Sequence, residues 1–153
     1  MEAMRIMLVD DEERYLKTTG KLLARKGYDA LTASGGAEAL ERLRSEKVHV
    51  VILDVKMPGM DGIATLKEIK RRFPMIEVIM LTGHATVESA IDGLKSGATD
   101  YLIKPADIDE IISKAEEAYA KRQNIEEKIR VARMRHLMKS PREIINESEE
   151  QNQ

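Results

Sequence analysis

The segment VVILDVKMPGMDG, residues 50–62, decides the fold of this chain of 153 residues. It opens with four apolar residues, three of them β-branched, which predict a strand buried on both faces. This run ends on the carboxylate of Asp54, and Pro58, Gly59 and Gly62 then turn the chain. A carboxylate at the end of a strand is often only the start of a turn, so its meaning depends on which other groups reach the same place.

Apolar runs and amphipathic segments alternate along the whole chain. The apolar runs, this one included, are residues 5–9, 28–32, 49–53, 76–81 and 99–103. The segments with helical periodicity are residues 12–27, 35–47, 62–73, 86–97 and 107–139, and Ser34 is the predicted N-cap of the second. Connections of helical length join parallel strands through right-handed crossovers, so the pattern predicts a doubly wound α/β fold. Five strands favour the flavodoxin-like order 2-1-3-4-5, with an extended C-terminal helix.

Composition excludes several classes of function. The chain has no cysteine, which rules out disulfides, iron–sulfur clusters and thiol catalysis. With a net charge of −2, one Phe, four Tyr and no Trp, the chain is not expected to bind nucleic acid directly. The start of the chain does not resemble a secretory signal, and no apolar stretch approaches the length that spans a membrane. These features predict a cytoplasmic protein.

Charged and hydroxyl side chains follow four of the five predicted strands. The first strand ends in Asp10 and Asp11, the third in Asp54, the fourth in Thr82 and the fifth in Lys104. Ligands of such sheets bind beyond the carboxyl ends of the strands, and three carboxylates gathered there repel one another unless a cation balances them. A hard divalent ion such as Mg²⁺ would do so. The set therefore predicts a phosphoryl-transfer site, with Asp54 as nucleophile, a metal on the acid pair, and Lys104 and Thr82 balancing the remaining charge.

The same residues have ordinary structural interpretations. Asp10 and Asp11 could favour the dipole of the first helix. Thr82 could cap a helix, and Tyr101 could be a plain core residue because it alternates with apolar neighbours. No single residue decides between these interpretations, but their convergence at one edge of the sheet favours the phosphoryl-transfer site.

Four segments resemble the signature segments of response-regulator receiver domains, the CheY-like phosphoacceptors of two-component signalling. They are VDDE (residues 9–12), LDVKMPGMDG (53–62), LTGH (81–84) and YLIKP (101–105), and the resemblance covers residues 5–121. It implies that a sensor histidine kinase phosphorylates Asp54. It also implies that Mg²⁺ is held by Asp10, Asp11, Asp54 and the backbone carbonyl of Lys56.

Further roles come from the same resemblance. It makes Thr82 and Tyr101 the switch pair, and it brings Lys104 into contact with the phosphoryl group. Lys56 and His84 flank the site at positions that tune the phosphoryl lifetime, and the Lys104–Pro105 peptide is expected to be cis. A receiver catalyses only its own phosphorylation and dephosphorylation, so no enzyme acting on other substrates is expected.

Two proteins of other classes share parts of this pattern. A flavodoxin has the same fold, but its first loop must cradle a phosphate, which the acids DDEE at residues 10–13 would repel. A phosphatase of the haloacid-dehalogenase type also uses an aspartate at a strand end. It normally has a second aspartate two residues later, where this chain has Lys56.

The last predicted helix is longer than a receiver needs, which divides the chain into three parts. These are a receiver domain at residues 4–121, a helical extension at 122–140 and a polar tail at 141–153 that is predicted to be disordered. A four-three spacing predicts a short coiled-coil seam, formed by Ile108, Ile111, Ala115, Ala118, Arg122, Ile125, Ile129 and Ala132. The predicted partner is a second copy, docked through the last two helices and the last strand. The alternatives are a partner-docking arm and a solvated helix.

The sequence does not identify an output. It contains no recognisable DNA-binding or catalytic output domain, which favours a stand-alone regulator that docks on a partner. The segment GHATVESAIDGLKSGATDYLIKP, residues 83–105, is similar to receivers that control AAA+ enhancer-binding activators. The alternative is therefore a receiver and linker from a larger transcription activator.

Overall fold

The computed structural model describes residues 3–55, 62–83 and 87–138, and it divides into two units, residues 1–120 and 121–153. Strands and helices alternate through the described residues. They are β1 (Arg5–Val9), α1 (Glu13–Arg25), β2 (Asp29–Ala33), α2 (Gly36–Leu43), β3 (Val50–Leu53), α3 (Gly62–Arg72), β4 (Glu77–Thr82), α4 (Val87–Lys95), β5 (Asp100–Ile103) and α5 (Ile108–Met138). Within those ranges no helix combines the length and the apolar character that crossing a membrane requires.

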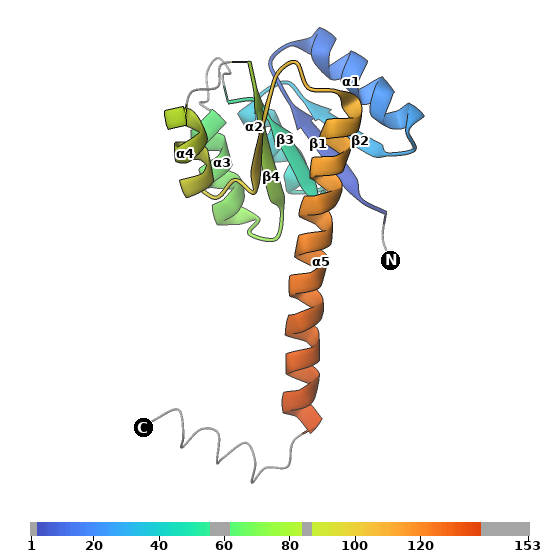
Figure 1. The fold of residues 1–153 in the computed structure, drawn as a ribbon, viewed down its shortest axis with the longest axis vertical. Helices are drawn as coiled ribbons and strands as arrows, with labels where there is room; N and C mark the ends of the chain where they lie inside the picture. Colours follow the sequence, from blue (N-terminus) through green and yellow to red (C-terminus); the bar gives the residue numbers. More distant parts are fainter. Residues whose placement is uncertain (1–2, 56–61, 84–86, 139–153) are drawn as a thin grey trace. The chain divides into compact units, whose positions relative to one another are not determined.

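The five strands form one parallel sheet in the order β2-β1-β3-β4-β5 (Figure 1). This confirms the fold and the strand order predicted from the sequence. The central strand β3 is buried along its whole length, as its continuous apolar run requires. All strands run in one direction, so their carboxyl ends share one edge of the sheet.

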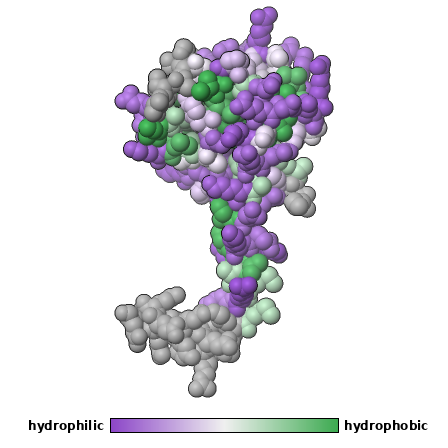
Figure 2. Space-filling view, in the orientation of Figure 1, coloured by the Kyte–Doolittle hydropathy of each residue, from purple (hydrophilic) through white to green (hydrophobic). Residues whose placement is uncertain are grey.

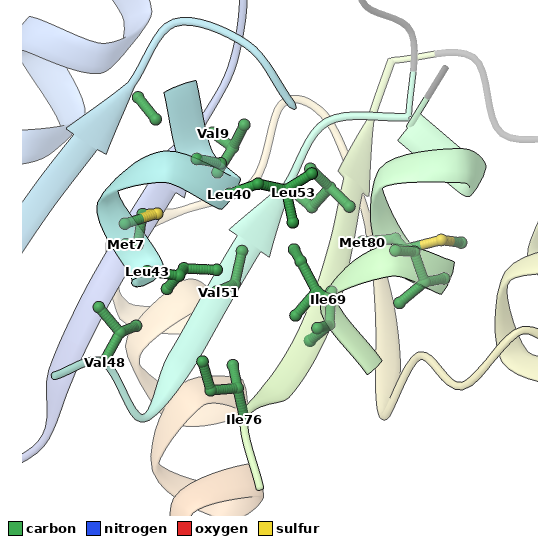
Figure 3. Packing of buried hydrophobic residues seen from close by; sticks show 14 of the residues in the cluster. Met7, Val9, Leu40, Leu43, Val48, Val51, Leu53, Ile69, Ile76 and Met80 are labelled. Carbon is green, nitrogen blue, oxygen red and sulfur yellow. The ribbon is translucent and has the colours of Figure 1, made fainter. Parts of the chain in front are cut away.

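Alternate residues of each strand enter one of two cores. Met7, Val51 and Met80 belong to the cluster that packs against α2 and α3, which Figure 3 shows from close by. Their neighbours Ile6 and Ile52 belong to the opposite cluster, which α1 and α5 cover. Because side chains alternate between the faces of a strand, burial on both faces fixes which residues can reach the carboxyl edge.

The predicted N-cap of the second helix is wrong by one residue. Gly35 occupies the N-cap position of α2, with no side-chain capping bond. Ser34 instead donates from its backbone N–H and its hydroxyl to Oε2 of Glu38, at 2.9 Å and 2.6 Å. These bonds hold the pKa of Glu38 below its ordinary value. Glu38 thus reaches back to the serine, the reverse of the expected capping bond.

The predicted coiled-coil seam is wrong in its first half. Ile111 is only 1% exposed and lies with Ala115 and Ala118 in the core between α5 and the sheet. Further along the helix, Ile125 and Ile129 are 39% and 45% exposed. Packing a helix on a sheet and packing it on a second helix require similar spacings, so the sequence pattern alone did not separate the two uses.

The start of α3 leaves no room for a side chain. Gly62 is buried, and its N–H donates to the carbonyl oxygen of Val55 at 3.1 Å. A Cβ at Gly62 would lie 2.5 Å from that oxygen and 2.7 Å from the carbonyl oxygen of Asp54. Both are backbone atoms, which cannot move aside without shifting the end of β3. The close approach of α3 therefore fixes the backbone that carries Asp54.

We expect Gly62→Ala to lower the free energy of unfolding by about 1–3 kcal/mol, because the added methyl group overpacks the end of β3. Gly20→Ala is the matched control. Gly20 lies inside α1, and a Cβ there would meet a Thr32 methyl group at an ordinary 3.7 Å. Alanine should therefore stabilise the protein by roughly 0.5–1 kcal/mol. Urea unfolding of both variants measures the two changes, and the same sign for both would contradict this account.

Candidate functional site

The predicted site residues meet at the carboxyl edge of the sheet. Asp10 follows β1, Asp54 follows β3, Thr82 is the last residue of β4, and Lys104 follows β5. These strands are consecutive neighbours in the sheet. The backbone continues the sheet's pairing into the site, since the Asp54 N–H donates to the carbonyl oxygen of Val9 at 2.9 Å. The position of each functional group thus follows from the register of the central strands.

Three carboxylates form the acidic part of the site. Oxygen atoms of Asp10, Asp11 and Asp54 lie within 4.8 Å of one another. Asp10 and Asp54 are only 2% and 7% exposed, whereas Asp11 is exposed. The backbone N–H of Glu12 donates to Oδ1 of Asp10 at 2.9 Å and holds that carboxylate in place. Two buried like charges at this separation favour binding of a cation.

Lys104 supplies the positive charge opposite this cluster. Its ammonium group donates a hydrogen bond to Asp10 and lies 3.7 Å from Oδ2 of Asp54. Burial alone would lower the pKa of Lys104, but the hydrogen bond and charge of Asp10, together with the charge of Asp54, raise it above its ordinary value. The lysine therefore stays charged. The peptide that follows, Lys104–Pro105, is cis, as the resemblance predicted.

The ring of Tyr15 closes one side of the site. The Lys104 ammonium lies 4.2 Å from the centre of this ring, and Tyr15 lines the same small hollow as Asp10 and Asp54. Tyr15 was not among the site residues predicted from the sequence. The overlooked signal is its place in the first turn of α1, which begins just beyond the carboxyl end of β1.

Thr82 and Tyr101 lie on neighbouring strands next to the acids. Thr82 is 1% exposed, and its carbonyl oxygen accepts a hydrogen bond from the Lys104 N–H at 2.9 Å. Tyr101 pairs with Met80 on β4, two register positions inward from the Thr82–Ile103 pair. Its hydroxyl is buried and finds no hydrogen-bond partner within residues 3–55, 62–83 and 87–138. Lys56 and His84, the residues expected to tune the site, lie outside the described residues.

The donor set fits a small, hard divalent cation. Such an ion prefers carboxylate oxygens, and Mg²⁺ in particular is usually held by one or two carboxylates with waters completing its shell. Asp10 and Asp11 can supply these ligands, and Asp54 lies close enough to join them. The three histidines of the chain, at positions 49, 84 and 136, are far apart in sequence and no cysteine accompanies them. Carboxylate oxygens suit hard divalent ions such as Mg²⁺, Ca²⁺ or Mn²⁺, and the cluster lacks the histidine and cysteine ligands that softer metals prefer.

Comparison with known proteins identifies relatives of the chain. The family model described as response regulator receiver domain matches residues 6–116. The transcriptional regulatory protein ZraR of Escherichia coli is 43% identical over 121 residues, which is 79% of this chain. The chain spans only 27% of the length of that relative.

Solved structures of receivers share the fold. A CheY-like response regulator receiver domain protein from Methanospirillum hungatei has a TM-score of 0.76 and 28% identity, covering 80% of this chain and 98% of its own. A response regulator protein from Burkholderia pseudomallei contains a phosphorylated aspartic acid, a calcium ion and citrate. It has a TM-score of 0.69 and 28% identity, covering 77% of this chain and 72% of its own.

Removing one acid should have opposite effects on stability and on metal binding. We expect Asp11→Asn to raise the melting temperature without metal, because it relieves repulsion in the cluster. The same change should weaken Mg²⁺ binding at least about tenfold, because it removes a ligand charge. Glu13→Gln is the matched control, since it removes an equal charge from the first turn of α1 outside the cluster.

Thermal unfolding across a Mg²⁺ titration measures both effects, because a ligand that binds only the folded state raises the melting temperature. The wild type and Glu13→Gln should respond at the same Mg²⁺ concentration. An Asp11→Asn protein with an unchanged Mg²⁺ response would show that Asp11 is not a ligand.

Proposed function

The chain belongs to the response regulator receiver family, and we propose that it accepts a phosphoryl group on Asp54 from a sensor histidine kinase. One observation carries this proposal: the Lys104 ammonium lies between Asp10 and Asp54, bonded to the first and 3.7 Å from the second. A nucleophilic carboxylate thus has a cation beside it and an acid pair that can hold a second cation. The phosphorylated aspartic acid of the Burkholderia pseudomallei relative supports the same chemistry here.

The proposed step is an in-line transfer. An oxygen of the Asp54 carboxylate forms a bond to phosphorus, while the bond from phosphorus to the donor breaks and the donor keeps the electron pair. Lys104 then exchanges its hydrogen bond to Asp10 for one to a phosphoryl oxygen, which is a movement of one side chain over a few ångströms. Asp10 and Asp11 would hold Mg²⁺, which when bound neutralises charge on the phosphoryl oxygens. The backbone carbonyl of Lys56 completes the proposed ligand set.

Thr82 and Tyr101 are the proposed switch. Phosphoryl oxygens offer new acceptors next to the Thr82 hydroxyl, and a Thr82 side chain turned toward them would leave space beside Tyr101. The buried hydroxyl of Tyr101, without a hydrogen-bond partner in the described ranges, supports this role. A buried unpaired hydroxyl costs roughly 1–3 kcal/mol, so the position of Tyr101 in the unmodified protein is not strongly favoured. A change of a few kcal/mol at Thr82 is then enough to shift the population of Tyr101 from one conformation to another.

The protein would act as a phosphoacceptor and not as an enzyme on other substrates. The hollow beside Asp54 is small and is lined by the side chains of Leu8, Val9, Asp10, Tyr15, Ile52, Asp54 and Leu81. Within the described residues it offers no room for a larger organic substrate. With a kinase as phosphoryl donor, the proposed place of action is the cytoplasm.

A second candidate function is control of transcription as the receiver of a larger regulator. The observation that favours it is the 43% identity to ZraR, of which this chain matches 27% of the length. In this case the phosphorylated receiver would control the remainder of the regulator through the α5 extension. The stand-alone regulator predicted from the sequence is the alternative.

A homodimer is the proposed output of the switch. Three apolar side chains on α4 and β5 are exposed, namely Ile91 at 45%, Leu94 at 50% and Ile103 at 57%. Ile125 and Ile129 are exposed on the second unit, where Figure 2 shows hydrophobic surface among hydrophilic residues. Each set suits a contact with a second copy, and Ile125 and Ile129 would meet their counterparts along a parallel seam. Association costs several kcal/mol, so the dimer should be weak.

Phosphorylation should map to Asp54 alone. We expect acetyl phosphate with Mg²⁺ to label the wild type, because Asp54 is the nucleophile beside Lys104, and to leave Asp54→Asn unlabelled. Asp29→Asn is the control, since it removes an exposed acid at the start of β2, far from the site in sequence and at the other edge of the sheet. Borohydride reduction followed by mass spectrometry locates the acyl phosphate, and label on any other residue would refute the proposal.

Exposed isoleucines of α5 should set the strength of the dimer. We expect the double variant Ile125→Lys, Ile129→Lys to weaken self-association more than tenfold. Each buried isoleucine is worth ~1.5–3 kcal/mol, and tenfold corresponds to about 1.4 kcal/mol. Leu137→Lys is the control, because Leu137 is 81% exposed but lies outside the four-three spacing. Analytical ultracentrifugation with and without beryllofluoride measures the self-association of the wild type and of both variants. A wild type that stays monomeric in both states would exclude the dimer.

A further inference from the structure

The aromatic ring of Tyr15 lies against the Lys104 ammonium group. Tyr15 has no role in the family resemblance and is not part of the acid cluster. The ammonium group lies 4.2 Å from the ring centre, within the range of a cation–π contact. The Lys104 side chain is 18% exposed, so the ring and the acids together enclose most of it. Tyr15 comes from α1, on a different element from Lys104 and from Asp54, and its contact therefore ties α1 to the end of β5.

The ring attracts the ammonium in a way that a carboxylate cannot. Asp10 and Asp54 both draw the ammonium group and compete for it, whereas the ring face offers a diffuse negative potential and no lone pair. Lysine has four flexible carbons, so an ammonium released by Asp10 can reach many positions, including solvent. A ring on one side removes those positions while leaving the approach to Asp54 open.

Tyr15 is itself held in place. The pKa of Tyr15 is raised, chiefly because the ring is buried, while a hydrogen bond with the Thr19 side chain and the charge of Lys104 act in the opposite direction. Thr19 lies one turn further along α1 and is only 5% exposed. Leu16, the residue after Tyr15, is buried in the core against the sheet. The ring therefore has a fixed position and can serve as a reference for the flexible lysine.

We propose that Tyr15 is a positioning residue that holds the Lys104 ammonium beside Asp54, so that the ammonium passes from Asp10 to the phosphoryl oxygens without entering solvent. This inference rests on the proposed phosphorylation of Asp54. Tyr15 acts through Lys104 and takes no part in bond making or breaking. The ring contacts the ammonium group itself, so it can act on the lysine both before and after phosphorylation.

The rate of Asp54 phosphorylation by acetyl phosphate at saturating Mg²⁺ tests the proposal. We expect Tyr15→Leu, which keeps the apolar bulk but loses the ring, to lower the rate about 3- to 10-fold, within the strength of a cation–π contact. Tyr15→Phe, which keeps the ring, should restore most of it. Tyr119→Leu is the matched control, because Tyr119 is a half-buried tyrosine that packs against His49 at the opposite edge of the sheet. If Tyr15→Leu does not fold, Tyr15→Met replaces it.

A double-mutant cycle with Lys104→Met separates positioning from simple packing. In the Lys104→Met background the change Tyr15→Leu should have no further effect on the rate, because there is no ammonium to position. Equal rates for the wild type, Tyr15→Leu and Tyr15→Phe would overturn the proposal. The same loss from Tyr15→Leu with and without Lys104 would also overturn it, since the ring would then only fill space.

A measurement on the unmodified protein keeps this inference distinct from the proposed function. The NMR signals of the Lys104 methylene protons next to the ammonium group should be shifted upfield by the ring in the wild type and in Tyr15→Phe. They should return to ordinary values in Tyr15→Leu. An unshifted wild-type signal refutes the ring contact. A shifted signal in a protein that acetyl phosphate does not label would refute the phosphorylation of Asp54 and with it the role of Tyr15 in that reaction.

Discussion

The repulsion among the carboxylates of Asp10, Asp11 and Asp54 is the constraint on which the rest of the structure depends. Their oxygens lie within 4.8 Å of one another, and two of the three side chains are buried. The apolar residues of the central strands stabilise the sheet, and the sheet holds the charges together at its carboxyl edge against their repulsion. Burying like charges is tolerable only beside a cation, and the Lys104 ammonium supplies it. This edge of the sheet is therefore suited to binding positive charge.

The proposed change of partner by Lys104 on phosphorylation needs only a single lysine. In the unmodified site the ammonium bonds to Asp10, the most buried of the acids. A divalent ion on Asp10 and Asp11 would satisfy the acids that Lys104 now satisfies, and the ammonium would become available to Asp54 and to whatever Asp54 carries. The short distance to Asp54, 3.7 Å, makes this a change of partner within the site. A lysine already free of both acids would lose the electrostatic reason to stay in a half-buried position.

The order of the strands and the convergence of the site followed from the sequence, for the same physical reason. Continuous apolar runs must be buried on both faces, and in a parallel sheet their carboxyl ends meet, so Asp54 and Lys104 could be placed together before any contact was known. The contact between the Tyr15 ring and the Lys104 ammonium could not be predicted, because it depends on the direction of two side chains from separate elements. Ile111 was wrongly assigned to a coiled-coil seam, because its spacing suits a seam and a contact with the sheet equally well. Only the tertiary structure shows that the sheet occupies this face of α5.

The position of Asp54 in the sheet determines where a change at the site can be felt. β3 is the central strand and is fully buried, so it has no freedom to transmit a displacement directly to the surface. β4 is buried along its whole length as well. β5, by contrast, is an edge strand paired only with β4, and its burial is incomplete, with Ile103 57% exposed. An edge strand with one neighbour has the fewest contacts to lose on moving. A rearrangement that starts at Asp54 and passes Thr82 on β4 is therefore expected to reach the surface at β5. Tyr101 and Lys104 lie in and next to that strand, and the exposed apolar residues that suit a partner begin there.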